Sequence, residues 1–169
     1  MQVSVRGETN TGFRNTLKKA AQFYANELMH INLVKNLYLT IYIVKKNKEY
    51  PDNGSCEWTD RSYNPREFAI YITEKLSKTG KLQTLAHEMV HLKQYAKNEM
   101  DGLDHATGIV KWKGVKFKLN SKMAPAHRKN GKLKIQSAGA DYYYLPWEVE
   151  AYGLEVGLST YFRHKFGVR

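Results

Sequence analysis

The apolar residues near the start of the chain follow a helical spacing. Between Phe13 and Met29 they recur every three or four positions, which is the pattern of one face of an amphipathic helix. The residues on this face are Phe13, Leu17, Ala20, Ala21, Tyr24 and Leu28. We expect this helix to pack on a sheet.

The segments after this helix have the composition of β-strands. Residues 37–44 are rich in β-branched and aromatic side chains, and the polar segment that follows ends in the turn signal Asn53-Gly54. Two further strands are predicted at Ser55–Asp60 and Arg66–Thr73. The first half of the chain therefore contains one helix followed by three strands.

Two longer helices are predicted in the second half. The first runs from about Lys81 to Asn98 and carries an apolar stripe made of Leu82, Leu85, Ala86, Met89 and Ala96. The second begins near Pro146 and continues to about Phe166, with acidic residues in its first turn. On this second helix, Gly153 and Gly157 share one face, a spacing that predicts close approach to another element.

The order of these elements predicts the fold class. We expect an α+β fold in which the N-terminal helix lies on a small mixed sheet and two later helices complete the structure. The 169 residues suffice for a single domain with its own core, so one domain over residues 1–169 is expected, with a basic insert at about 105–140.

Cysteine content and hydropathy limit the environment of the chain. Cys56 is the single cysteine, so no internal disulfide and no thiolate zinc site is expected, which suits a reducing compartment. The first residues lack the apolar region of a signal peptide, and nowhere do about 18 uncharged apolar residues run consecutively. We expect a cytoplasmic protein that is neither secreted nor bound to a membrane.

The net charge of +11 is concentrated in one segment. Residues 105–140 contain eight lysines and Arg128 but no acidic residue. One interpretation is a hairpin with a solvated basic face and an apolar face of Val110, Trp112, Val115 and Phe117. The others are binding of a polyanion such as nucleic acid, or attraction of an acidic protein substrate. The basic residues of the hairpin are Lys111, Lys113, Lys116 and Lys118.

The first long helix contains the motif HExxH at His87–His91. At about 100° per residue, the two histidines lie only about 40° apart, so their imidazoles can share one tetrahedral cation. Glu88 points about 100° away from His87, where it can reach a metal-bound water as a general base without being a ligand. The motif therefore predicts one zinc ion per chain.

A catalytic zinc site needs a third protein ligand and an open position for water. Two residues compete for the third position, Glu148 at the start of the last helix and His105 shortly after the motif. Glu148 and Glu150 differ by about 200°, so only one of them can face the metal, and Tyr152 shares the face of Glu148.

Several segments together resemble a known family. The chain is similar to the SprT-like zinc metallopeptidases of bacteriophages, a branch of the zincin group, over roughly residues 66–157. The resemblance is carried by His87–His91, by Gln94-Tyr95, by residues 111–114 (KWKG) and by residues 146–151 (PWEVEA). In gluzincin-type relatives, the first glutamate of such an ExEA sequence is the third ligand, which implies Glu148 here.

This sequence departs from the pattern of the family in two respects. The SprT proteins proper use a histidine shortly after HExxH, which would correspond to His105, but here Ala-Thr follows it in place of a glycine-rich turn. Their cysteine zinc ribbon is absent as well. With His87, His91 and Glu148 as ligands, the resemblance implies a zincin-like fold and a zinc endopeptidase. In it, Glu88 takes a proton from a polarised water and later passes it to the leaving amine.

Other residues are candidates for supporting roles. A tyrosine could donate to the developing oxyanion or contact substrate, and the candidates are Tyr142, Tyr143, Tyr144 and Tyr152. Asp101, Asp104 and Asp141 are candidate acceptors for the ring N–H groups of the ligand histidines. Phe68–Thr73 is interpreted as an edge strand to which an extended peptide substrate adds.

Two hypotheses of function follow. The first is a zinc endopeptidase that cleaves protein or peptide substrates, including DNA-associated proteins, in the cytoplasm of a host cell. The alternative is a nucleic-acid-binding protein in which the zinc site is structural and the lysine-rich segment contacts phosphates.

Overall fold

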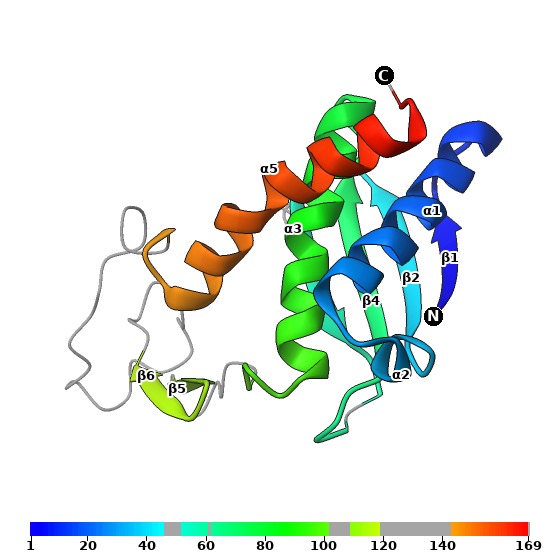
Figure 1. The fold of residues 1–169 in the computed structure, drawn as a ribbon. Coiled ribbons are helices and arrows are strands. Elements are labelled where there is room, and N and C mark those ends of the chain that lie inside the picture. Colours follow the sequence, from blue (N-terminus) through cyan, green and yellow to red (C-terminus); the bar gives the residue numbers. More distant parts are fainter. Residues whose placement is uncertain (46–51, 61, 102–108, 119–142, 169) are drawn as a thin grey trace.

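The computed structural model describes residues 1–45, 52–60, 62–101, 109–118 and 143–168, and an α+β fold is confirmed for this part of the chain (Figure 1). The strands are β1 (Gln2–Arg6), β2 (Tyr38–Val44), β3 (Gly54–Trp58), β4 (Glu67–Thr73), β5 (Ile109–Trp112) and β6 (Val115–Lys118). The helices are α1 (Thr11–Leu28), α2 (Ile31–Val34), α3 (Lys78–Ala96) and α5 (Pro146–Phe166). The sequence pattern predicts all of these except β1 and the short α2.

A four-stranded mixed sheet forms the base of the fold, in the order β1-β2-β4-β3. The strands β1, β2 and β4 are parallel, and β3 pairs with β4 in the antiparallel direction. Alternate residues of β2 and β4 point into one core, and they are Leu39, Ile41, Ile43, Phe68, Ile70 and Ile72. The expected small mixed sheet is therefore present.

The interpretation of Phe68–Thr73 as an edge strand is wrong. β4 is hydrogen-bonded to β2 on one side and to β3 on the other. Its nearly continuous apolar sequence is typical of a strand that is buried on both faces. β3 is the strand that forms this edge of the sheet.

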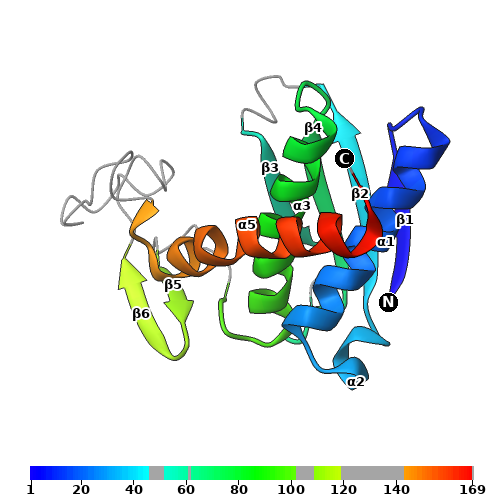
Figure 2. The same cartoon turned by 45° about the horizontal axis from the view of Figure 1, so that its top comes forward.

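The helices α1, α3 and α5 all lie on the same face of the sheet (Figure 1). Figure 2 shows α5 running across α3 toward α1. The three helices meet at Tyr24, whose hydroxyl donates to the Leu82 carbonyl at 3.3 Å and whose ring packs 5.7 Å from that of Phe162. This shared core fixes the position of α5 relative to α3.

The helix α3 is enclosed on nearly all sides. Its predicted apolar stripe is buried, from Leu82 to Ala96. The opposite side, which carries the HExxH motif, is also buried, because α5 packs along it. The motif residues His87, Glu88 and His91 are each at most 9% exposed.

The hairpin of β5 and β6 forms a second, smaller core with the start of α5. Buried side chains of Met100, Val110, Trp112, Leu145 and Trp147 make up this cluster, and Phe117 packs against it. The predicted apolar face of the hairpin is thus present for three of its four residues. Val115 is 58% exposed, because it follows the turn at the tip of the hairpin.

The prediction that Gly153 and Gly157 allow close approach to another element is wrong for the described residues. A Cβ atom built on either glycine meets no atom within 4 Å, and both positions face outward from α5. In the described part of the chain, no helix is long and apolar enough to cross a membrane.

Candidate metal centre

The helix α3 brings two imidazole rings together. His87 and His91 are one turn apart, and their Nε2 atoms lie 3.1 Å from each other. Both side chains are close to nine-tenths buried. The helical spacing of the motif therefore places both rings at one point, as the sequence predicts.

Glu148 reaches the same point from α5. It lies in the first turn of that helix, and its two carboxylate oxygens are 3.4 Å from His87 Nε2 and 3.5 Å from His91 Nε2. Ligand atoms of the three residues all lie within 4.8 Å of one another, and all three residues are buried. The structure thus brings together the three residues that the sequence favours as ligands.

The other ring nitrogen of each histidine is held by an acceptor. His87 Nδ1 lies 2.8 Å from Glu155 Oε2, and a carboxylate can only accept, so Nδ1 carries the proton. His91 Nδ1 lies 2.8 Å from Oε1 of Gln94. The amide nitrogen of Gln94 donates to Trp147 O and Glu150, which leaves its oxygen to accept from His91. In its neutral form, each histidine therefore carries its proton on Nδ1 and a lone pair on Nε2.

Lone pairs of two imidazoles and a carboxylate thus converge on one buried point. Such a point attracts a cation. Zinc bonds of about 2.0–2.1 Å at tetrahedral angles place neighbouring ligand atoms about 3.3 Å apart. The observed separations of 3.1, 3.4 and 3.5 Å agree with that spacing. His87, His91 and Glu148 therefore form a site that could hold a metal ion.

The same convergence raises the pKa of both histidines in the metal-free chain. Burial by itself lowers the pKa of His91, but the hydrogen bond to Glu148 and the charges of Glu88 and Glu148 raise it to about 9. The pKa of His87 is raised by the same carboxylates against the same opposing effect of burial. The site therefore favours positive charge at this point.

Glu88 lies beside this site and is 5% exposed. Burial raises the pKa of its carboxyl, while the nearby His91 and His87 act to lower it. Glu88 is not one of the three residues whose ligand atoms converge, and this agrees with its predicted place beside the ligands. A raised pKa suits a group that accepts and returns a proton near neutral pH.

Glu150 faces away from the metal site, as its angle to Glu148 predicts. It accepts hydrogen bonds from Gln94 at 2.9 Å and from the Lys93 ammonium at 3.0 Å. Lys93 is buried and also contacts Glu99 at 2.6 Å, and Lys113 of the hairpin reaches Glu150 at 3.3 Å. These contacts join α3, α5 and the hairpin around Gln94, and so they hold the acceptor of His91 in place.

The predicted tyrosines differ in their relation to the site. Tyr152 packs with its ring 4.6 Å from that of His87, and it is 39% exposed. Tyr143 lies 5.2 Å from Tyr152, ring to ring. Tyr144 is 78% exposed. Of the described tyrosines that the sequence singles out, Tyr152 is the one in ring contact with a ligand histidine. Tyr142 lies outside the described residues.

The aspartates proposed as acceptors for the ligand histidines do not take that role in the described chain. Asp101 instead lies 3.7 Å from Lys111 on the surface, and Asp104 and Asp141 lie outside the described residues. Glu155 and Gln94 are the acceptors. The helical spacing contains a signal for both, because Glu155 follows Glu148 by two turns and Gln94 follows His91 by three residues.

We predict that Glu155→Ala lowers zinc affinity by about 10- to 100-fold, because outer partners of ligand histidines have effects of this size. Glu155→Gln should lose less, since its amide oxygen can still accept from His87 Nδ1. The measurement is competition with a chromophoric chelator. Gln83 also donates a hydrogen bond to Glu155 at 2.7 Å and so helps to fix its carboxylate. Equal zinc affinity of the alanine variant and the parent would contradict the role of Glu155.

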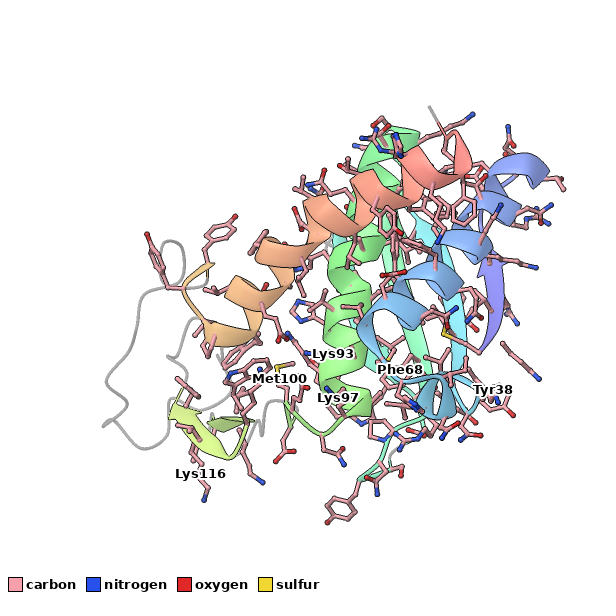
Figure 3. All side chains as sticks on the ribbon, viewed as in Figure 1. Tyr38, Phe68, Lys93, Lys97, Met100 and Lys116 are labelled. Atoms are coloured by element: carbon pink, nitrogen blue, oxygen red, sulfur yellow. The ribbon has the colours of Figure 1, made fainter. Side chains whose placement is uncertain are left out.

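The basic hairpin is exposed in part. Lys111 and Lys116 pair across β5 and β6, and Lys116 extends away from the rest of the molecule (Figure 3). Lys113 forms an ion pair with Glu150. The Lys93 side chain lies between α3 and the hairpin region (Figure 3). The side chain of Lys118 and most of the other basic residues of the segment lie outside the described residues, as does His105, the alternative third ligand.

Comparison of the chain with protein-family models, with curated proteins and with solved structures found no match. The fold and the site define an α+β protein with a buried His-His-Glu cluster that could hold a metal ion.

Proposed function

We propose that this protein is a zinc-dependent endopeptidase, with His87, His91 and Glu148 as zinc ligands and Glu88 as the general base. The observation that carries the proposal is the convergence of two Nε2 lone pairs and a carboxylate beside a separate buried carboxylate. Two imidazoles and one carboxylate form a known ligand set of catalytic zinc, in which the fourth position stays open.

The protein side chains divide the remaining work. Bound zinc supplies a Lewis acid that polarises water and a peptide carbonyl. Glu88 accepts a proton from the attacking water and later donates it to the leaving amine. Glu155 and Gln94 accept from the Nδ1 protons of the histidines, and this fixes the two rings with their Nε2 atoms toward Glu148.

The edge strand β3 is the proposed place for the substrate backbone. The bonds from Thr73 N to Asn53 O and from Thr59 N to Glu67 O identify the residues of β3 whose backbone groups face β4. Gly54, Cys56 and Trp58 alternate with these, so their N–H and C=O groups point away from β4, to the outer edge of the sheet that the structure describes. An extended peptide can pair with them as an added strand.

Tyr152 is the proposed donor to the developing oxyanion. Its ring contacts His87, and burial together with Glu148 raises the pKa of its phenol, so the hydroxyl keeps its proton. A neutral phenol near the reacting carbonyl can donate a hydrogen bond as negative charge develops on the oxygen.

The family and setting are part of the same proposal. The motifs at residues 87–91 and 146–151 support membership of the SprT-like zincins, active in the cytoplasm of a phage-infected host. Lys111 and Lys116 form an exposed basic pair near the start of α5, which favours substrates associated with DNA. A second candidate function rests on the same pair. In it, the protein binds nucleic acid and the zinc is structural.

We expect the purified protein to contain one zinc per chain and to cleave an unfolded protein such as casein. Dialysis against a strong chelator should abolish cleavage, and stoichiometric zinc should restore it. The measurements are elemental analysis and the rate of peptide release on the same samples. A chain that binds no zinc, or that retains zinc yet cleaves no polypeptide, would contradict the proposal.

A further inference from the structure

Gly54 of the edge strand lies in unusually close contact with Glu88. A Cβ atom built on Gly54 would stand 2.7 Å from Glu88 Oε1 and 2.5 Å from Thr84 Cγ2. Real Cβ contacts below 3.0 Å are essentially absent from proteins. The backbone of Gly54 belongs to a regular strand with no left-handed φ, so a side chain here would be opposed by the close approach of Glu88 and Thr84 and not by the backbone conformation.

The strand register explains why the two groups meet. Gly54 pairs with Ile72, and side chains at this position of β3 point toward the helices, because Ile72 itself points into the core. The N–H and C=O of Gly54 lie in the sheet plane and point away from β4, to the outer edge of the described sheet. One residue therefore contacts the base and borders the place of the substrate backbone.

We propose that Gly54 is a positioning residue that seats the Glu88 carboxylate directly against the edge strand. The inference rests on the proposed peptidase function, in which the water and the substrate carbonyl lie between β3 and the metal ligands. The missing side chain at position 54 lets the carboxylate lie at the distance from β3 that proton transfer requires, since general bases act within hydrogen-bond reach.

The Gly54→Ala variant tests this directly, because the groups that must yield are side-chain ends. The backbone of β3 is held by its ladder with β4, whereas the Glu88 carboxylate and the Thr84 methyl can move. We therefore expect the fold and the zinc ligands to survive while Glu88 is displaced. A displacement of about 1 Å at a catalytic group can cost about 100-fold in rate.

The contact itself is measurable without substrate. In chelator-treated protein, thermal unfolding is compared for the parent, Gly54→Ala, Glu88→Ala and the double variant. We expect the decrease in Tm caused by Gly54→Ala to be at least halved when Glu88 is already alanine, because no carboxylate then meets the new methyl. Equal decreases in both backgrounds would overturn the inference, whatever the activity of the protein.

The positioning role is measured on the zinc-loaded protein. Gly54→Ala should retain one zinc per chain and an unchanged KM while kcat falls by about 100-fold. Ser55→Ala, the next residue of β3 with its side chain on the other face of the sheet, should match the parent. Coupling in Tm with an unchanged kcat overturns the positioning role.

The contribution of Thr84 is separated by a further variant. Thr84→Ser removes the methyl that an alanine at position 54 would meet. The proposal expects Gly54→Ala with Thr84→Ser to remain slow, since the contact with Glu88 persists. Full recovery of kcat would assign the effect to Thr84 and overturn the proposal. Absence of cleavage in the parent would refute the peptidase assignment, while the Tm cycle would still report on the contact.

Discussion

Replacing Glu88 by glutamine should lower peptide-bond cleavage by about 100- to 10,000-fold, the range that general acid–base groups contribute. Glutamine has nearly the same shape, so the 5% exposed side chain keeps its packing against β3, but it can no longer accept a proton. Zinc content should not change, because Glu88 is not among the three converging ligands. The measurement is kcat/KM on a peptide substrate beside zinc per chain.

The matched control is Glu57→Gln, the same change at an exposed position of the neighbouring strand. It should retain the cleavage rate of the parent. Cleavage by Glu88→Gln at the parent's rate would remove Glu88 from its role as base. The nucleic-acid alternative predicts a different result. Under it, the protein binds DNA with an affinity that falls steeply with salt, and Glu88→Gln binds as tightly as the parent.

The elements that the sequence predicts well are those with a local signal. The helical spacing from Phe13 and the HExxH motif each depend on neighbours three or four residues away, and the structure has helices at both places. β1 is not predicted because Gln2–Arg6 is only five residues long, although its alternation of polar and apolar residues is the pattern of a half-buried strand.

The position of a strand within a sheet is not a local property. The sequence 68–73 is apolar enough for an interior strand, but only the pairing with β2 and β3 shows that β4 is one. The burial of the HExxH side of α3 is also non-local, since it comes from α5. A helix wheel drawn for α3 alone leaves that side exposed.

The partners of the ligand histidines illustrate the same limit. Helical angles alone predict that Glu148 and Glu150 face different sides of α5, whereas the choice of Glu148 as the ligand comes from the resemblance to the zincins. Whether Glu155 or an aspartate accepts from His87 depends on how α5 crosses α3, which the shared core around Tyr24 and Phe162 determines. Charged residues near a site are therefore easier to propose as ligands than as supports.

Replacing Glu148 by alanine should lower zinc affinity by more than about 100-fold, which exceeds the effect expected for an outer partner such as Glu155. The variant keeps two imidazoles 3.1 Å apart but loses the carboxylate that completes the site. The measurement is zinc per chain after dialysis against a weak chelator, with Val149→Ala, at an exposed position of the same helix, as the control. Zinc retained by Glu148→Ala at the parent's level would transfer the third position to His105.

The same variant should change how metal-free stability depends on pH. Glu148 helps to raise the pKa of His91 from 6.5 to about 9, against the effect of burial. Charged His91 therefore stabilises the folded chain fully below pH 6.5, and this contribution is lost as pH rises toward about 9. Without Glu148 the folded pKa is lower, so Tm should fall less between about pH 6 and pH 9 in the variant than in the parent. An identical fall in both proteins would show that Glu148 does not interact with the histidines.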